Sequence, residues 1–231
     1  MIKGIIFDKD GTLFDFNATW GPFTRSLISS ETGNDPSRMA DMARVLGYSM
    51  SSGLFAPTSI VIAETVSVVA DAMLVLLPDV TKLDLIARMK AATKYVPQVE
   101  PTPLRPVLNE LRTMNLILGV ATNDAEEPAR ANLAHVLDMF DFIAGFDSGF
   151  GGKPDPGQLL EFCAQTQLFP SNCIMVGDSL HDLDAGRAAG MGCVGVLTGP
   201  ATRSDLTPHA DVVLENIAEL PAWIAVQNAS G

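Results

Sequence analysis

Short runs of apolar residues followed by polar residues recur at the start of the chain and again after residue 98. The first run is Ile5, Ile6 and Phe7, which is long enough for a short buried strand. Further runs of this kind are LILGVA (116–121), DFIAGF (141–146), CIMVGD (173–178), MGCVGVLTG (191–199) and the beginning of ADVVLENIAEL (210–220). We expect each of these runs to form one strand of a sheet.

The segments between these strands have the apolar spacing of helices. The predicted helices are LRPVLNELRTM (104–114), QLLEFCAQTQL (158–168), AGRAAG (185–190) and the end of 210–220. Short apolar strands that alternate with helices are typical of a mostly parallel sheet covered by helices on both faces. The pattern therefore predicts an α/β fold built on a parallel sheet.

A segment of different character, residues 15–97, follows the first strand. It lacks a convincing alternation of apolar and polar residues, and its pattern predicts helices at 17–31, 36–47, 57–77 and 81–95. The helical connection between two parallel strands is ordinarily far shorter than this segment. We therefore expect 15–97 to form an inserted helical subdomain, with 1–14 and 98–231 together forming the sheet-containing core.

The amino-acid composition limits the classes of partner that the chain can bind. The 231 residues include 27 Asp and Glu but only 15 Lys and Arg, so the net charge is −12. Without a basic patch, which the sequence does not show, such a chain is a poor ligand for nucleic acid or for an anionic membrane surface. The most apolar stretch, 60–77, contains Glu64 and Asp71 on one helical face, which favours an amphipathic helix over a membrane span.

Cysteine usage and the first residues bear on the cellular compartment. Cys163, Cys173 and Cys193 are odd in number and show no CxxC spacing, so we expect buried free thiols, which suit a reducing compartment. Only MIKGII precedes the acidic FDKD, so we expect no secretory signal here. A cytoplasmic location is therefore expected.

Acidic side chains follow the first strand and a later one. Residues two apart in an extended chain point to the same side, so Asp8 and Asp10 face one way, while Lys9 between them is directed elsewhere. The carboxyl ends of parallel strands meet at one edge of a sheet, where ligands bind. The other polar residues that follow strands or lie in the connecting loops are Thr122, Asn123, Lys153, Asp178 and Asp182. We expect these residues to converge on Asp8 and Asp10.

Four carboxylates at one edge would repel one another strongly. Two unit charges about 4 Å apart interact by about 4 kcal/mol at an effective dielectric constant of about 20. Cations must compensate: Lys153 is one, and a bound divalent metal is the natural second. Oxygen ligands with few His or Cys residues nearby favour Mg²⁺ over zinc or copper. A carboxylate nucleophile, a second acid, cations, and hydroxyl and amide donors together suit phosphoryl transfer.

The chain resembles the haloacid dehalogenase superfamily in four motifs, which are FDKDGTLFD, ATN, GGKPDP and GDSLHDLDAG, in this order and spacing. The segments GRAAGM, VGVLTG and ADVVLENIAEL are similar to those of phosphoglycolate phosphatases, in the subgroup with a helical cap inserted after the first motif. The resemblance implies a Rossmann-like parallel sheet core, an inserted all-helical cap and the hydrolysis of a small phosphorylated metabolite. We expect a monomer or a homodimer.

The resemblance also implies a role for each motif residue. Asp8 is the nucleophile that forms an aspartyl-phosphate, and Asp10 is the general acid and base. Mg²⁺ is held by Asp8, Asp178 and the backbone carbonyl of Asp10. Asp182 holds Lys153 or a metal-bound water. The implied ligands of the phosphoryl oxygens are Thr122, the Asn123 amide and Lys153.

Some features lie outside this pattern. Lys9 stands where many relatives have an apolar residue, and a Lys9 side chain that leaned toward the site would alter the charge met by a substrate. The predicted cap contains Arg25, Arg38 and Arg44 but no signature for a particular substrate. The substrate is therefore open, with a phosphoglycolate-like molecule as the first candidate.

Two alternative functions remain. A sugar phosphomutase of the same superfamily keeps the same catalytic pairs and differs mainly in its cap. A signalling module that is phosphorylated on aspartate and turns over slowly belongs to another class, but it needs no helical insertion, and Asp10 favours turnover. A haloalkanoate dehalogenase is disfavoured, because it has no use for a second acid or a metal.

Overall fold

The computed structural model describes residues 1–56, 58–63, 66–93 and 96–230. The chain forms two compact units. The first combines Met1–Asp15 with Glu100–Gly231, and the second is the continuous segment Phe16–Val99. The first unit is thus built from two parts of the chain that are separated by the whole of the second.

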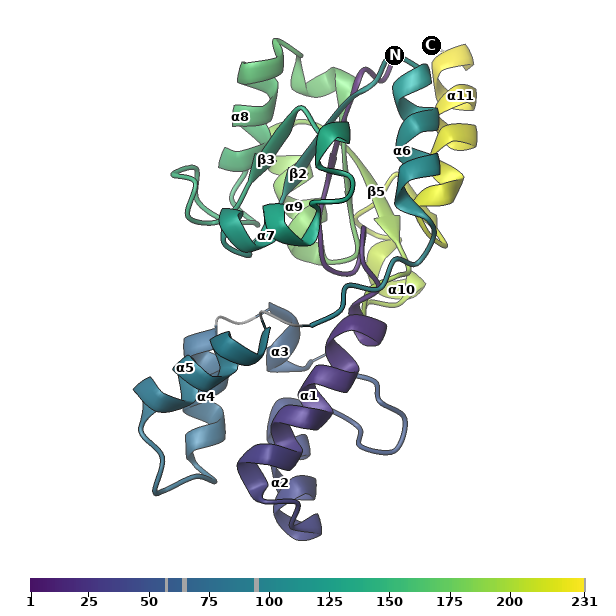
Figure 1. Ribbon diagram of the computed structural model, residues 1–231. Coiled ribbons are helices and arrows are strands. Elements are labelled where there is room, and N and C mark those ends of the chain that lie inside the picture. The colour runs from purple at the N-terminus through teal and green to yellow at the C-terminus, as the bar shows by residue number, and fades with distance from the viewer. Residues whose placement is uncertain (57, 64–65, 94–95, 231) are drawn as a thin grey trace. The chain divides into compact units, whose positions relative to one another are not determined.

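A six-stranded parallel sheet forms the centre of the first unit (Figure 1). Its strands are β1 (Gly4–Phe7), β2 (Ile117–Ala121), β3 (Phe142–Ala144), β4 (Cys173–Gly177), β5 (Gly192–Val196) and β6 (Val212–Leu214). They lie in the order β3-β2-β1-β4-β5-β6. The predicted α/β parallel sheet is confirmed, and β1, the first strand in the chain, lies in its interior between β2 and β4.

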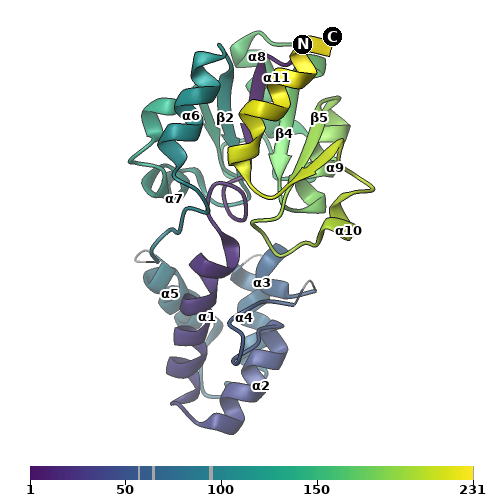
Figure 2. The same cartoon turned by 90° about the vertical axis from the view of Figure 1, so that its right-hand side faces the viewer.

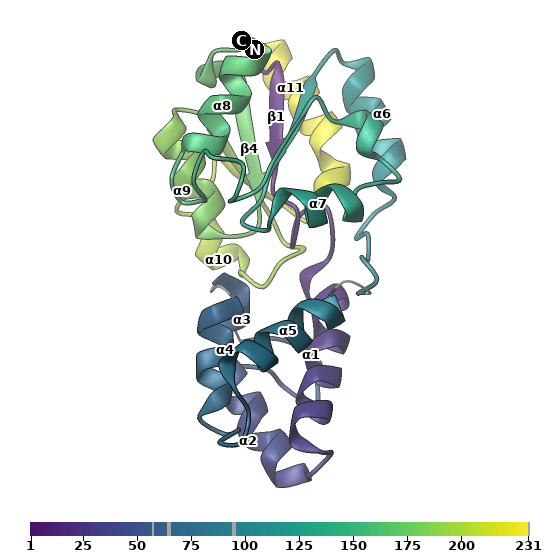
Figure 3. The same cartoon turned by 60° about the vertical axis from the view of Figure 1, so that its left-hand side comes forward.

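Helices cover both faces of this sheet (Figure 3). The alternation of side chains along β1 divides the core, because Ile5 and Phe7 belong to one buried cluster and Ile6 to another. The cluster of Ile5 and Phe7 includes residues of α6 (Leu104–Thr113) and α11 (Leu220–Ser230), which lie in front of the sheet in Figure 2. The cluster of Ile6 includes residues of α8 (Gly157–Thr166) and α9 (Leu180–Ala189).

Two further helices of this unit, α7 (Glu126–Asn132) and α10 (Arg203–Leu206), are short and were not expected from the apolar pattern. The helix α9 begins at Leu180, five residues before the predicted 185–190, because Asp182 in its first turn accepts hydrogen bonds from the backbone N–H and hydroxyl of Ser179. Cys163, Cys173 and Cys193 are buried and free, as expected.

The second unit packs helices around its own apolar core. Its helices are α1 (Phe16–Thr32), α2 (Pro36–Leu46), α3 (Ile60–Ala63), α4 (Val66–Leu74) and α5 (Lys82–Thr93). Within the predicted helix 57–77 the structure describes two helical stretches, α3 and α4, and residues 57 and 64–65 lie outside the described part. The end of the predicted helix 81–95, residues 94–95, also lies outside it. No described helix is long and apolar enough to cross a membrane.

This unit is not purely helical, because Tyr48 and Phe55 form an isolated antiparallel bridge. The turn between them contains Gly53 with a φ of 76°, a conformation that favours glycine. The Tyr48 hydroxyl donates a hydrogen bond to the Gly21 carbonyl oxygen at 2.9 Å, which ties the turn to α1. A single bridge of this kind leaves no alternation in the sequence from which it could be predicted.

Phe162 of α8 offers a test of the sheet's packing. Its side chain is fully buried, and its ring centroid lies 5.8 Å from that of Phe142 on β3. Phe162→Ala should lower the free energy of unfolding by about 3–5 kcal/mol, the usual cost of removing a buried phenylalanine. The control is Phe169→Ala, since Phe169 is 75% exposed. Denaturant titration measures both, and equal stability of the two variants would contradict the assigned core.

Candidate active site

The predicted motif residues follow neighbouring strands at one edge of the sheet. Phe7 at the end of β1 is paired with Val120 on β2 and with Val176 on β4. Asp8, Thr122 and Asp178 come one or two residues after these paired positions, so the register places them side by side. Asn123 follows Thr122, Lys153 lies in the loop before α8, and Asp182 lies in the first turn of α9. All of these residues belong to the first unit.

Lys153 joins two of the carboxylates. Its Nζ lies 2.5 Å from Asp8 Oδ1 and 2.7 Å from Asp182 Oδ1. All three side chains are nearly inaccessible to solvent, so their attraction is little screened by water or salt. The other oxygen of Asp182 accepts hydrogen bonds from Ser179, which fixes the Asp182 carboxylate toward Lys153. The structure therefore places Asp182 against Lys153, one of the two arrangements that the family resemblance implied.

Asp178 is a buried carboxylate that the lysine does not contact at ion-pair distance. Thr12 donates a hydrogen bond to its Oδ1 over 3.4 Å. Two glycines make room for it, because a Cβ atom at Gly199 would lie 1.7 Å from Asp178 Oδ2 and one at Gly11 would lie 2.4 Å from the same oxygen. Side chains at either position would displace this carboxylate.

Asp8, Asp178 and Asp182 form a group that fits a metal ion. Each offers one carboxylate oxygen, and these oxygens all lie within 4.8 Å of one another. All three residues are buried, and their ligand atoms are hard oxygens, which suit Mg²⁺. This compact set of buried oxygen donors is compatible with a bound divalent cation.

Burial makes the carboxyl groups of Asp8 and Asp178 hard to ionise without such a cation. Burial raises the pKa of Asp8 to about 7, although Lys153 opposes the shift. The pKa of Asp178 is raised well above its usual range by burial and then by the charges of Asp182 and Asp8. Lys153 has a raised pKa, because the attraction of Asp182 and Asp8 outweighs its burial, so it stays protonated.

Asp10 is paired with Lys9 rather than with Lys153. Lys9 Nζ lies 2.5 Å from Asp10 Oδ2 and 3.1 Å from Asp124 Oδ2. The expectation that Lys9 is directed elsewhere is wrong with respect to Asp10: the lysine is fully buried beside that acid. Burial lowers the pKa of Lys9, but the two carboxylates outweigh that effect and raise it, so the ammonium persists.

Thr122 and Asn123 are anchored by the loops around them. The Asn123 side chain donates to the Lys153 carbonyl oxygen at 2.9 Å and accepts from the Lys153 N–H at 2.8 Å. These bonds fix the backbone that presents the lysine. The Thr122 hydroxyl accepts a hydrogen bond from the Asp124 N–H at 3.1 Å, and the Thr122 carbonyl oxygen accepts one from buried Gln158 at 3.1 Å.

Some residues of this site were missed by sequence reasoning. Asp124 directly follows the ATN motif, which is the signal that could have identified it. Gln158 lies in the predicted helix 158–168, and Gly199 ends the predicted strand 191–199. The sequence therefore indicates only a structural role for each. Their contacts are with residues far away in the sequence, and the spacing of neighbouring residues does not predict such contacts.

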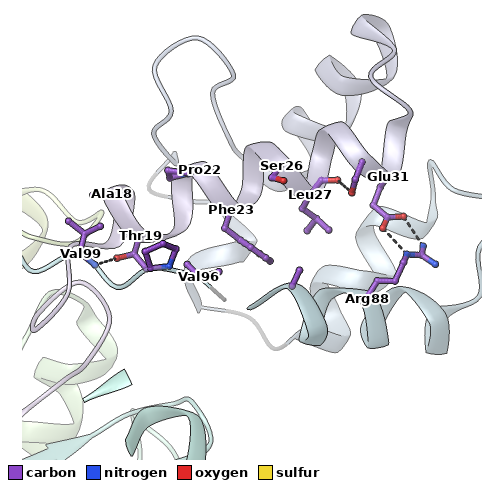
Figure 4. A pocket seen from close by; sticks show the side chains of 13 residues that line it. Ala18, Thr19, Pro22, Phe23, Ser26, Leu27, Glu31, Arg88, Val96 and Val99 are labelled. Carbon is purple, nitrogen blue, oxygen red and sulfur yellow. Dashed lines mark hydrogen bonds and ion pairs between the residues drawn. The ribbon is translucent and has the colours of Figure 1, made fainter. Parts of the chain in front are cut away.

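A separate hollow of about 610 Å³ lies in the second unit (Figure 4). It is lined by α1, α5 and residues 96–99, and apolar side chains such as Phe23 and Leu27 form much of its wall. The Glu31–Arg88 ion pair lies at one end, and a hydrogen bond from the Val99 N–H to Thr19 lies at the other. None of the predicted site residues lines this hollow.

Comparison with known proteins places the chain among hydrolases. It is 38% identical over 110 residues to a phosphoglycolate phosphatase of Nitrosospira multiformis, which covers 47% of this chain and 48% of that protein. The chain thus spans about half the length of that relative. It is 27% identical over 236 residues to a validoxylamine A 7'-phosphate phosphatase of Streptomyces hygroscopicus subsp. limoneus, covering 95% and 96% of the two chains.

The fold and the family agree with these similarities. A putative β-phosphoglucomutase structure from Thermotoga maritima superposes with a TM-score of 0.73 at 20% identity, covering 97% of this chain and 99% of that one. The family described as haloacid dehalogenase-like hydrolase matches residues 5–196. This match spans the sheet through β5 together with the inserted segment, and it confirms the resemblance found in the four motifs. The chain therefore belongs to the haloacid dehalogenase-like hydrolase family.

Proposed function

We propose that this protein is a Mg²⁺-dependent phosphatase that hydrolyses a small phosphate monoester through an aspartyl-phosphate on Asp8. The observation that supports this most directly is the separation of the two acids of the first motif. Asp8 pairs with Lys153, whereas Asp10 pairs with Lys9. Two carboxylates in such different surroundings are suited to different tasks, one as nucleophile and one as acid and base.

In the first step an oxygen of the Asp8 carboxylate attacks phosphorus, and the bond from phosphorus to the ester oxygen breaks. Asp10 gives its proton to that oxygen, so the leaving group departs as an alcohol. The phosphoryl oxygens are held by Thr122, Lys153 and the backbone N–H of Asn123. The Asn123 backbone is assigned this role because the Asn123 side chain is already hydrogen-bonded to the Lys153 backbone. The product of this step is a phosphorylated Asp8.

In the second step water attacks the phosphorus of phosphorylated Asp8. Asp10 takes a proton from this water, and the bond between phosphorus and the Asp8 oxygen breaks. Inorganic phosphate and the free carboxylate result. Asp182 keeps Lys153 oriented in both steps, since the same ammonium group contacts Asp182 and Asp8.

The residues that would hold Mg²⁺ are Asp8, Asp178 and the backbone carbonyl of Asp10, with Asp182 beside them. When bound, the ion supplies positive charge for the phosphoryl group and for the crowded carboxylates. The raised pKa values of Asp8 and Asp178 support this assignment, because a cation would stabilise their ionised forms.

Phosphoglycolate or a similar small phosphorylated metabolite is the first candidate substrate. The relatives named above as phosphatases support this class. We further propose that the segment Phe16–Val99 acts as a cap that selects the leaving group, because it is inserted directly after the loop that presents Asp8 and Asp10. Release of inorganic phosphate without a sugar bisphosphate activator would separate a phosphatase from a phosphomutase.

Replacement of the nucleophile tests the first step. Asp8→Asn should remove phosphatase activity almost completely, by at least about 10³-fold, since the amide is a poor nucleophile. Inorganic phosphate release measures the activity, and far-ultraviolet circular dichroism should show that the fold persists. Wild-type-like activity in this variant would refute the assignment of Asp8.

Replacement of the acid and base tests the second step. Asp10→Asn should lower kcat by about 10²–10⁴-fold, the usual contribution of a general acid or base. Rapid acid quenching followed by mass spectrometry should find phosphate on the Asp8 peptide. The role of Asp10 in releasing phosphate from the enzyme loses its support if this variant never accumulates phosphorylated protein.

Removal of the metal should make stability depend on pH. Folding raises the pKa of Asp8 from 3.8 to about 7, so the metal-free folded state binds protons more tightly than the unfolded state. Stability from this group is therefore present below about pH 4 and lost as the pH rises through about 7. In EDTA the Tm should fall by several degrees between pH 5 and pH 8, and Mg²⁺ should reduce this fall.

The matched control for this pH effect is Asp8→Asn, which removes the titrating group. Its Tm in EDTA should change less with pH than that of the wild-type protein. An unchanged pH dependence of the wild-type Tm on adding Mg²⁺ would argue against a metal at this cluster.

A further inference from the structure

Lys9 requires an explanation, because an ammonium group is costly to bury. Its side chain has no exposure to solvent, whereas an apolar side chain of similar length would fill the same space without the loss of hydration. Both of the close ionic partners of Lys9 are acids of the catalytic edge, Asp10 and Asp124. The Lys9 ammonium also lies 5.9 Å from the centre of the Phe14 ring. The positive charge of Lys9 is therefore paired with these two acids.

The backbone around Lys9 is held by a closed turn. The N–H groups of Leu13 and Phe14 both donate to the Lys9 carbonyl oxygen at 3.0 Å, and the Gly11 N–H donates to the Phe14 carbonyl oxygen at 2.7 Å. The Thr198 hydroxyl fixes the same turn from outside through the Gly11 carbonyl oxygen at 2.6 Å. These bonds fix the backbone from which the Lys9 side chain reaches Asp10.

The backbone of Asp124, the second acid that contacts Lys9, is also held by hydrogen bonds. Its N–H donates to the Thr122 hydroxyl at 3.1 Å, and its carbonyl oxygen accepts from the Phe146 N–H at 3.0 Å. Gly145 permits this close approach, because a Cβ there would lie 2.6 Å from the Asp124 carbonyl oxygen. The acid that shares Lys9 with Asp10 is thus anchored to the loop that presents Thr122.

We propose that Lys9 is a positioning residue that, together with Asp124, holds the Asp10 carboxylate in one orientation for both proton transfers. This inference rests on the proposed function, since it assigns Asp10 the proton transfers. The contact engages Asp10 Oδ2, which fixes the rotation of the carboxylate relative to Asp8. Without the Lys9 contact, Asp10 would face the ester oxygen and the attacking water for a smaller part of the time, and small misplacements of a reacting group lower the rate strongly.

The test is Lys9→Met, which keeps the length of the side chain and removes the charge. With an alkyl phosphate substrate, kcat should fall by about 10²-fold, while KM changes less than about threefold because the phosphate ligands are untouched. The control is Lys3→Met, since Lys3 is exposed and lies outside the site. Wild-type kcat in Lys9→Met would overturn the proposal.

An aryl phosphate substrate distinguishes a misoriented Asp10 in Lys9→Met from a smaller amount of folded enzyme. A phenolate leaves without needing a proton, so Lys9→Met should still phosphorylate Asp8 rapidly and then release phosphate slowly. Stopped-flow absorbance should show a burst of phenolate approaching one equivalent per folded chain. A uniformly slow reaction without a burst would mean that Lys9 does not act through Asp10.

The double variant Lys9→Met/Asp124→Asn distinguishes positioning from simple charge balance. It removes one ammonium and one carboxylate, so its Tm should recover toward that of the wild-type protein. Its kcat should stay low, because the ammonium contact to Asp10 Oδ2 is still missing. Recovery of kcat together with Tm would overturn the proposal and leave Lys9 a purely structural role.

Failure of this inference is distinguishable from failure of the proposed function. If the wild-type protein releases no phosphate from any phosphate monoester, or if Asp10→Asn retains full activity, the proposed function fails and the inference fails with it. If the wild-type protein is active and Asp10→Asn is slow while Lys9→Met is fast, the proposed function stands and only the inference is wrong.

Discussion

The crowding of carboxylates at one edge of a parallel sheet is the constraint on which the rest of this structure depends. Asp8, Asp10, Asp124, Asp178 and Asp182 lie together there, and two buried ammonium groups lie among them. Lys153 bridges Asp8 and Asp182, and Lys9 bridges Asp10 and Asp124. The acids outnumber these cations, and burial raises the pKa of Asp8, Asp124 and Asp178. The excess of negative charge is greatest where Asp8, Asp178 and Asp182 meet beside the single ammonium of Lys153. A divalent cation at that point would complete the balance.

The topology of the sheet produces this crowding from distant parts of the chain. The order β3-β2-β1-β4-β5-β6 puts β1 between β2 and β4, so residues that follow three different strands become neighbours. Glycines then allow the loops to approach closely, as Gly11 and Gly199 do around Asp178. The segment Phe16–Val99 is inserted in the chain between β1 and β2, and all six strands of the sheet come from the first unit.

Much of this arrangement could be predicted from the sequence, because strand ends and residues two apart follow simple geometric rules. The sheet, its approximate strand positions and the set Asp8, Thr122 and Asp178 are of this kind, whereas Lys153 lies in the loop before α8 and follows no strand end. Lys9 was different: the alternation rule directs it away from Asp8 and Asp10, whereas its long side chain contacts Asp10.

Binding of Mg²⁺ to the resting protein tests the central claim most directly. Calorimetric titration in buffers of different ionisation enthalpy reports both the ion bound and the protons displaced. The account predicts about one ion per chain, with proton release near pH 6–7 that disappears at higher pH, and much weaker binding to Asp178→Asn. Equal binding to the wild-type protein and to Asp178→Asn, or none to either, would contradict it.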